Sequence, residues 1–246
     1  MNRTAGWLAL ALIVATAPGA VRADFIYGGQ AYGAFSPGVV DPPIAATGAL
    51  PATGGVLTAH LPNFSFMGVV TSGALDAQTM GVGGVASSDA SVATFHADLR
   101  AIGINFIADG DRIEAHARAD GTATPLSVTG SAMFTNLVVN SMMINPQAAP
   151  NTMISLGAAG FLVLNEETST MTASDGTIAV NAVHVHLNAG IDIYLAHAES
   201  SISNQLAAVP EPRTGILLGI GILALLGFHR LMGRSYSRPN RSGMTG

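Results

Sequence analysis

Residues 112–120 read RIEAHARAD, and their alternation decides the fold class. Ile113, Ala115, Ala117 and Ala119 take every second position, and charged or polar side chains take the positions between them. Successive side chains of a β-strand point to opposite faces, whereas a helical repeat of 3.6 residues would scatter these charges around the axis. The segment is therefore predicted to be a half-buried strand.

Other segments alternate in the same way. In ASVATFHADL (90–99), Ala93, Phe95, Ala97 and Leu99 are expected on one face of a strand. Further strands are predicted at SVTGSAMFTNLVV (127–139), FLVLNE (161–166), TIAVNAVHVHL (177–187) and IDIYLAHA (191–198). About ten short strands without a helical period predict an all-β fold, a β-sandwich-like domain of two sheets. A solenoid is the alternative, but no repeat of fixed length is found.

Two details of strand register are also predicted. Asp109-Gly110 is typical of a type I′ turn, which would pair Phe106 with Ile113, Ile104 with Ala115 and Ile102 with Ala117 in a hairpin. Within 177–187 the apolar phase changes near Ala182, and a β-bulge there would keep one apolar face. The two sets of opposite parity are Ile178, Val180 and Ala182, then Val183, Val185 and Leu187.

The two ends of the chain predict export. A basic start, an apolar run from Trp7 to Ala17 and small side chains before the cleavage point after Ala23 are typical of a signal peptide. Near the other end, the apolar segment Gly215–Phe228 is followed by Arg230, Arg234, Arg238 and Arg241, which the positive-inside rule places in the cytoplasm. Pro210 and Pro212 stiffen the strip before it. A plain single-pass anchor remains an alternative.

These features divide the chain into six parts. They are a signal peptide (1–23), a Pro/Gly-rich strand and loop region (24–62), a β-rich ectodomain (63–206), a linker with the PEP motif (207–213), a transmembrane helix (214–232) and a basic cytoplasmic tail (233–246).

Composition narrows the function classes. The chain has no lysine and no cysteine. Residues 24–209 carry three arginines against fourteen acidic residues, a formal charge of −11. Such a domain repels nucleic acid, so no nucleic-acid partner is expected. The absence of cysteine excludes both disulfides and thiol catalysis.

Candidate chemical sites are few. His184 and His186 share one strand face and could chelate a metal with Asp192 or Asn188, but spacing fixes no third ligand, so no metal is predicted. Asp109-Gly110-Asp111 is better explained by turn chemistry than by a calcium loop. Glu166 and Glu167 are adjacent, so they would point to opposite faces and would not act as a catalytic pair. No catalytic residue and no cofactor is predicted, and the protein is expected not to be an enzyme.

Two resemblances add to this interpretation. VPEP (209–212), the apolar segment and the arginine-rich end together resemble the PEP-CTERM sorting signal of Gram-negative bacteria. The resemblance implies that Pro210, Glu211 and Pro212 are recognised by the membrane transpeptidase exosortase, which removes the tail near the motif. Arg213 and the extension SYSRPNRSGMTG (235–246) depart from the usual pattern.

The middle of the chain, from about Ala45 to His197, resembles the choice-of-anchor P family of exported bacterial proteins. The resemblance is carried by ATGALPATGGVLTAHLP (46–62), ASSDASVATFHADL (86–99), PNTMISLGAAGFLVLNEE (150–167) and TIAVNAVHVHL (177–187).

Together these features imply a non-enzymatic protein at the cell surface or in the extracellular matrix, processed by signal peptidase and exosortase. Before processing, the C-terminal helix would hold it in the inner membrane. Bacteria with this sorting system commonly make exopolysaccharide, so a structural or adhesive role in a biofilm is the expected function. A carbohydrate-binding β-sandwich module is the alternative. Stacking on sugars usually needs exposed aromatic side chains, and residues 24–209 have no tryptophan and only three tyrosines, Tyr27, Tyr32 and Tyr194. A hydrolase is a third and weaker possibility.

Overall fold

The computed structural model describes residues 23–188 and 190–206. Residues Ala23–Gln205 form one compact unit with its own core. The predicted all-β class and the two antiparallel sheets are confirmed. The strands are more numerous and longer than expected, however: fifteen are described, and β15 alone spans 16 residues.

One sheet has six antiparallel strands. In spatial order they are β12 (Thr152–Ser155), β13 (Gly160–Met171), β14 (Asp175–Leu187), β15 (Ile191–Leu206), β1 (Ala23–Ser36) and β2 (Val40–Ile44).

The other sheet has nine strands built around the long pair β7 (Val85–Asp98) and β8 (Ile107–Asp120). Each central strand is flanked by two short strands, one beside each of its halves. The flanking and outer strands are β3 (Gly55–Leu61), β4 (Phe64–Phe66), β5 (Val70–Ser72), β6 (Leu75–Val82), β9 (Ser127–Thr135), β10 (Val138–Val139) and β11 (Met142–Met143). Two short 3-10 helices, η1 (Leu99–Ile102) and η2 (Gly157–Ala159), complete the described elements.

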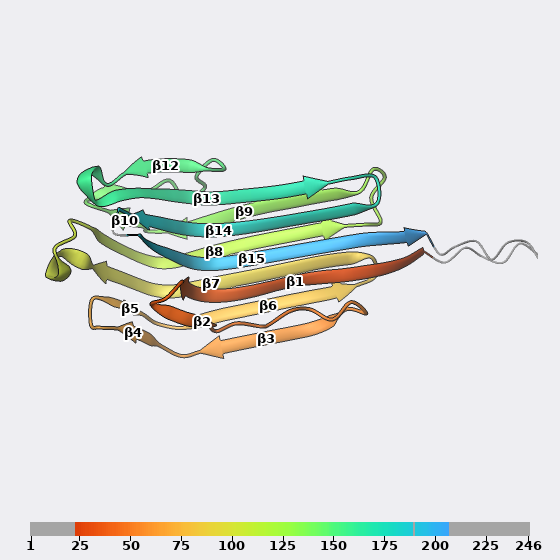
Figure 1. The fold of residues 1–246 in the computed structure, drawn as a ribbon, viewed down its shortest axis with the longest axis horizontal. Coiled ribbons are helices and arrows are strands. Elements are labelled where there is room, and N and C mark those ends of the chain that lie inside the picture. The colour runs from red at the N-terminus through yellow and green to blue at the C-terminus, as the bar shows by residue number, and fades with distance from the viewer. Residues whose placement is uncertain (1–22, 189, 207–246) are drawn as a thin grey trace, which may run out of the picture. The chain divides into compact units, whose positions relative to one another are not determined.

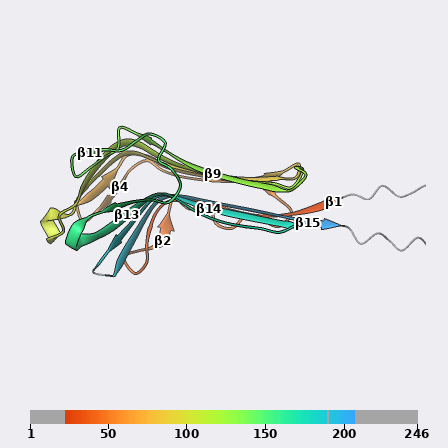
Figure 2. The ribbon, with the colours of Figure 1, turned by 90° about the horizontal axis from the view of Figure 1, so that it is seen from above.

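The sheets stack face to face into a long sandwich (Figures 1 and 2). β1 begins and β15 ends at the same end of it, and both sheets bend near the opposite end (Figure 2). The predicted Pro/Gly-rich region 24–62 supplies β1 and β2 to one sheet and β3 to the other. No helix among the described residues is long and apolar enough to cross a membrane.

The core between the sheets has two halves of different composition. The small-residue half contains many buried alanines and serines between larger side chains such as Ile113, Phe134 and Val180, namely Ala86, Ser88, Ala90, Ala115, Ala117, Ala119, Ala132, Ala198 and Ser200. The large-residue half is lined by buried phenylalanine and leucine, namely Phe95, Leu99, Phe106, Leu137, Leu162, Leu164, Leu187 and Leu195.

The small-residue half brings the two sheets into close contact. A Cβ on Gly130 of β9 would lie 2.6 Å from the Val180 side chain of β14, so only glycine fits there. The Ser200 hydroxyl of β15 donates to the Ala117 carbonyl of β8 at 3.0 Å. The Ser88 hydroxyl of β7 donates to the Glu199 carbonyl of β15. Hydrogen bonds therefore cross the core within the small-residue half.

The boundary between the halves is a change of strand phase. On β14, Ala182 and Val183 are both buried, as the predicted phase change requires. The predicted β-bulge is wrong, because Asn181 pairs with His197 and Val183 with Leu195 without an extra residue. The neighbouring strands change phase at the same level, where two non-glycine residues, Asn165 of β13 and Ala196 of β15, have positive φ.

A similar change occurs on β7 of the other sheet, at Thr94, whose φ is 48°. The prediction for 90–99 is therefore confirmed for Phe95, Ala97 and Leu99, which are buried, and wrong for Ala93, which lies on the other side of the phase change and is half-buried. The predicted alternation of 112–120 is confirmed on β8.

The predicted hairpin around Asp109-Gly110 is wrong. Both residues lie inside β8, and Ile113 pairs with Val92 of β7 and Phe134 of β9 rather than with Phe106. The turn between β7 and β8 is η1 followed by Gly103, whose φ is 84°. Gly110 instead faces the core, where an added Cβ would lie 3.3 Å from Leu137. A buried glycine that faces the core had the appearance of a turn residue.

Candidate functional site: a histidine–tyrosine face

Polar and aromatic side chains gather on the outer face of the six-stranded sheet, over β13, β14, β15 and β1. Cross-strand register brings them together, since His186 stands opposite Asp192, His184 opposite Tyr194 and Asn181 opposite His197. Outward positions on neighbouring strands lie about 5 Å apart, so side chains of this size touch. We call this set the His–Tyr face: Tyr32, Phe35, Phe161, Glu166, Asn181, His184, His186, Asp192, Tyr194, His197 and Glu199.

His184 lies between two carboxylates. Its Nδ1 is 3.1 Å from Glu166 Oε2, and its Nε2 is 3.1 Å from Asp192 Oδ1. Burial of the ring opposes a charge, but the hydrogen bonds to both carboxylates outweigh it and raise the pKa of His184. Because carboxylates accept and do not donate, both ring nitrogens must carry protons to satisfy both contacts. His184 is therefore best described as an imidazolium bridging β13 and β15.

The carboxylates respond in the opposite sense. The hydrogen bond from His184 lowers the pKa of Glu166, which also accepts from the Asn181 amide at 2.7 Å. The hydrogen bond from His186, at 2.7 Å, lowers the pKa of Asp192. Glu166 on β13, His184 on β14 and Asp192 on β15 therefore place negative, positive and negative charges on three neighbouring strands.

His197 is the buried exception. Burial lowers its pKa to about 4, so its ring is neutral at pH 7. Its Nδ1 lies 2.6 Å from Asn181 Oδ1, whereas its Nε2 is 4.0 Å from Glu199. With a neutral ring, the contact with Glu199 is not an ion pair.

The rings of the face stack on one another. His184 and Tyr194 have centroids 4.3 Å apart, and Tyr32 and His197 have centroids 4.4 Å apart at 13° between planes. Burial raises the pKa of both tyrosines, so both phenols stay protonated. In each pair one flat side of the tyrosine is covered by a histidine, and Tyr32 and His197 are both buried.

The predicted metal ligands are brought together only in part. His184, His186 and Asp192 meet on the His–Tyr face, but the Asn188 amide donates to the Ala158 carbonyl instead. The two nitrogens of His184 point at different carboxylates, so the cluster has no common centre. Within residues 23–188 and 190–206, no group of three histidine or acidic side chains has the geometry to hold a metal.

The other sequence candidates separate. Asp109 contacts His96 and Asp111 accepts from Asn136, so the pair does not form one loop site. Glu166 lies on the His–Tyr face. Its neighbour Glu167 lies on the opposite side of β13, near Gly130. The predicted sorting residues Pro210, Glu211 and Pro212 and the topology-determining Arg230, Arg234 and Arg238 lie outside the described residues.

Sequence reasoning missed Tyr194, His197 and Tyr32 as members of one site. Tyr194 and His197 lie on either side of the phase change at Ala196, so simple alternation places them on opposite faces. Tyr32 joins them only because β1 lies beside β15 in the sheet. The available signal was the density of histidine and acidic residues in 184–199.

Comparison of the chain with known protein families, with curated proteins and with solved structures gives no match.

Proposed function

We propose that this chain is an exported protein of the surface or extracellular matrix of a Gram-negative bacterium, with a non-enzymatic structural or adhesive role in exopolysaccharide. The signal-like start and the PEP-CTERM-like end support export and sorting. The observation that carries the role of the domain is the His–Tyr face, a polar surface held on a rigid sheet by cross-strand hydrogen bonds.

The state of His184 supports a non-enzymatic role. A general base needs a nitrogen lone pair within reach of a substrate proton. Both nitrogens of His184 face carboxylates, and its side chain is only 13% exposed. His197 has a neutral ring but is also buried. The groups of the face thus hold one another, which suits a contact surface better than a reaction centre.

A carbohydrate-binding module is the second candidate, favoured by the presence of Tyr32 and Tyr194 beside carboxylates and an amide on one face. Sugar hydroxyls donate readily to carboxylates. Tyr32 is buried and His184 covers one side of Tyr194, so a sugar would be bound through the carboxylates rather than by stacking on these rings. The negative charge of the domain favours a neutral polysaccharide.

The adhesive role is tested by binding of purified protein to exopolysaccharide from the producing strain and to a glycan array. Asp192→Asn changes the His–Tyr face, and Asp76→Asn is the matched control because Asp76 also pairs with a histidine, His60, on the other sheet. We expect weaker binding for Asp192→Asn alone. Equal binding of both variants would contradict the role of this face, and binding of one defined neutral glycan would favour the module.

Processing is tested separately in cells with and without exosortase. With the enzyme, intact-mass measurement should find a mature chain that begins after Ala23 and ends near Val209 or within Pro210–Pro212. Without it, the chain should remain in the inner membrane. A chain that keeps its C-terminus through Gly246 in the presence of exosortase would make the segment an ordinary anchor.

A further inference from the structure

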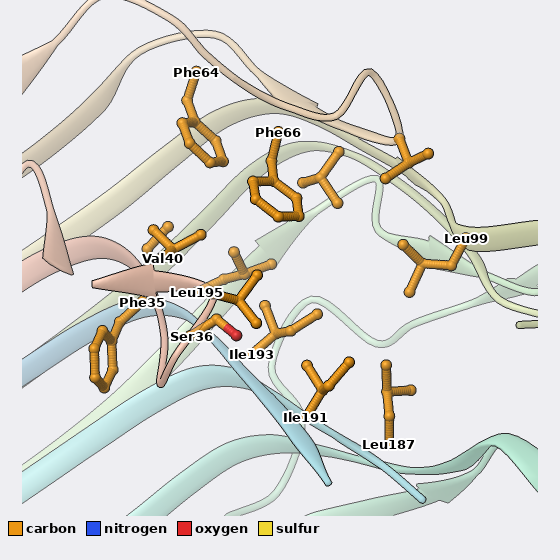
Figure 3. A pocket seen from close by; sticks show the side chains of 14 residues that line it. Phe35, Ser36, Val40, Phe64, Phe66, Leu99, Leu187, Ile191, Ile193 and Leu195 are labelled. Atoms are coloured by element: carbon orange, nitrogen blue, oxygen red, sulfur yellow. The ribbon is translucent and has the colours of Figure 1, made fainter. Parts of the chain in front are cut away.

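An apolar cavity opens between the sheets at the end of the large-residue half (Figure 3). Phe64 and Phe66 of β4 point into it from one sheet, and Ile193 and Leu195 of β15 line it from the other. Its volume is about 80 Å³, several times the ~10–15 Å³ that one water molecule needs. None of its lining residues carries a charge.

The residues that line the cavity differ in their exposure to solvent. Leu99, Leu187 and Leu195 are at most 4% exposed and form its floor. Phe64 and Phe66 are half-buried, and Val39, which also lines the cavity, is 41% exposed. The cavity therefore joins solvent through an apolar mouth.

One polar group in this lining has no partner. Ser36, at the end of β1, is 3% exposed, and its Oγ makes no hydrogen bond to any described residue. Ala34 and Ser36 both line the cavity, and a register shift in the pairing of β1 with β2 lies between them. Figure 3 shows its hydroxyl among the apolar side chains of the lining. Buried hydroxyls in native proteins nearly always have a partner, so this one calls for a ligand atom.

We infer that the cavity binds a neutral aliphatic chain carrying one oxygen, such as an alcohol or an ester, which hydrogen-bonds to Ser36 Oγ. The apolar walls match the hydrocarbon, and the single unpartnered hydroxyl matches the single oxygen. A free carboxylate fits poorly, because a charge buried without a partner is costly and the domain is already strongly negative. This inference does not depend on any binding of polysaccharide, although Phe35 of the His–Tyr face also lines the cavity.

Hexanol is a soluble probe of this chemistry, and hexanoate is its charged counterpart. Methyl chemical shifts of the unit Ala23–Gln205, with a repeat on the full chain in lipid nanodiscs, would follow the titration. We expect saturable shifts at Ile191, Ile193 and Leu195, and affinity for hexanoate at least about tenfold lower. Ser36→Ala should weaken the binding of hexanol by about 2- to 10-fold, the worth of one hydrogen bond.

A variant that fills the cavity distinguishes binding in the cavity from binding at the protein surface. Val70, half-buried in the lining, is changed in Val70→Phe, and Val56→Phe, at a site 57% exposed on β3, is the matched control. Val70→Phe should abolish binding and Val56→Phe should leave it unchanged, with the fold of both checked by thermal unfolding. The inference is overturned if hexanol does not saturate, if Val70→Phe binds as well as the original chain, or if hexanoate binds equally. It is also overturned if sedimentation shows that a second copy covers the cavity.

Discussion

The two halves of the sandwich have different ways of holding the sheets together. In the small-residue half, alanine, serine and glycine let the sheets approach, and the Ser200 hydroxyl donates across the core. In the large-residue half, leucine and phenylalanine fill a wider space, and a cavity remains at its end. The comparison shows that the same two sheets can be in close contact in one half and enclose a cavity in the other. The long strands that run through both halves change phase at the boundary between them.

The largest expected effect comes from removing a large side chain. Leu162 of β13 is fully buried in the large-residue half and lines a small internal void. Leu162→Ala should lower the free energy of unfolding by about 2–5 kcal/mol, because the void is enlarged and apolar contacts are lost. Urea unfolding measures the loss. A change below about 1 kcal/mol would mean that this half collapses easily around the deletion.

Overfilling the small-residue half should have the next largest effect. Ala132 of β9 is 3% exposed and faces the opposite sheet, whereas the adjacent Ser131 faces solvent. Ala132→Leu should cost about 1–3 kcal/mol because the sheets must separate, and Ser131→Leu should cost much less. Thermal unfolding of both variants is the measurement. Equal stability of the two would argue against tight sheet contact.

Loss of a hydrogen bond across the core should have a smaller effect. Ser200→Ala removes the bond to the Ala117 carbonyl and should destabilise the domain by about 0.5–1.5 kcal/mol. Ser201→Ala changes the next residue, which faces outward, and serves as the control. Should both variants unfold at the same denaturant concentration, the bond would contribute little to sheet contact.

The smallest expected effect is a pH dependence on the outer face of the large-residue half. The raised pKa of His184 means that its contribution to stability is present below about pH 6.5 and lost as pH rises through the folded value. The lowered pKa values of Glu166 and Asp192 make their contribution present above about pH 4 and lost as pH falls.

His184→Gln should therefore reduce stability more at about pH 5.5 than at about pH 8.5. Thermal unfolding of both proteins at the two pH values gives the difference. His197, whose lowered pKa opposes folding in acid, is present in both proteins and its effect cancels in the comparison. The same loss at both pH values would mean that His184 is not charged between the two carboxylates.

Much of the fold could be predicted from local alternation, but not every detail of register. RIEAHARAD indicated a strand with alanine inward, and β8 has that orientation. The phase change at Ala182 was also visible in the sequence. The hairpin at Asp109-Gly110 failed because a glycine tolerates both a turn and close packing, and only the position of Leu137 distinguishes them.

The candidate site was less predictable than the fold. His184, His186 and Asp192 are near one another in sequence, so their grouping could be proposed. Tyr32 is far from them in the chain, and the cavity residue Ser36 has no sequence signal at all. Their positions depend on β1 lying beside β15, a pairing between the two ends of the domain.

The sequence by itself determined the all-β class, the inward face of most strands and the negative charge of the domain. These properties follow from the order of neighbouring residues, because side chains alternate along any strand whatever its partner. Tertiary structure alone decided which strands pair, where the turns lie and which polar groups meet. These features depend on packing residues that are distant in sequence into one core. That packing brings β1 beside β15 and so forms the His–Tyr face and the cavity at Ser36.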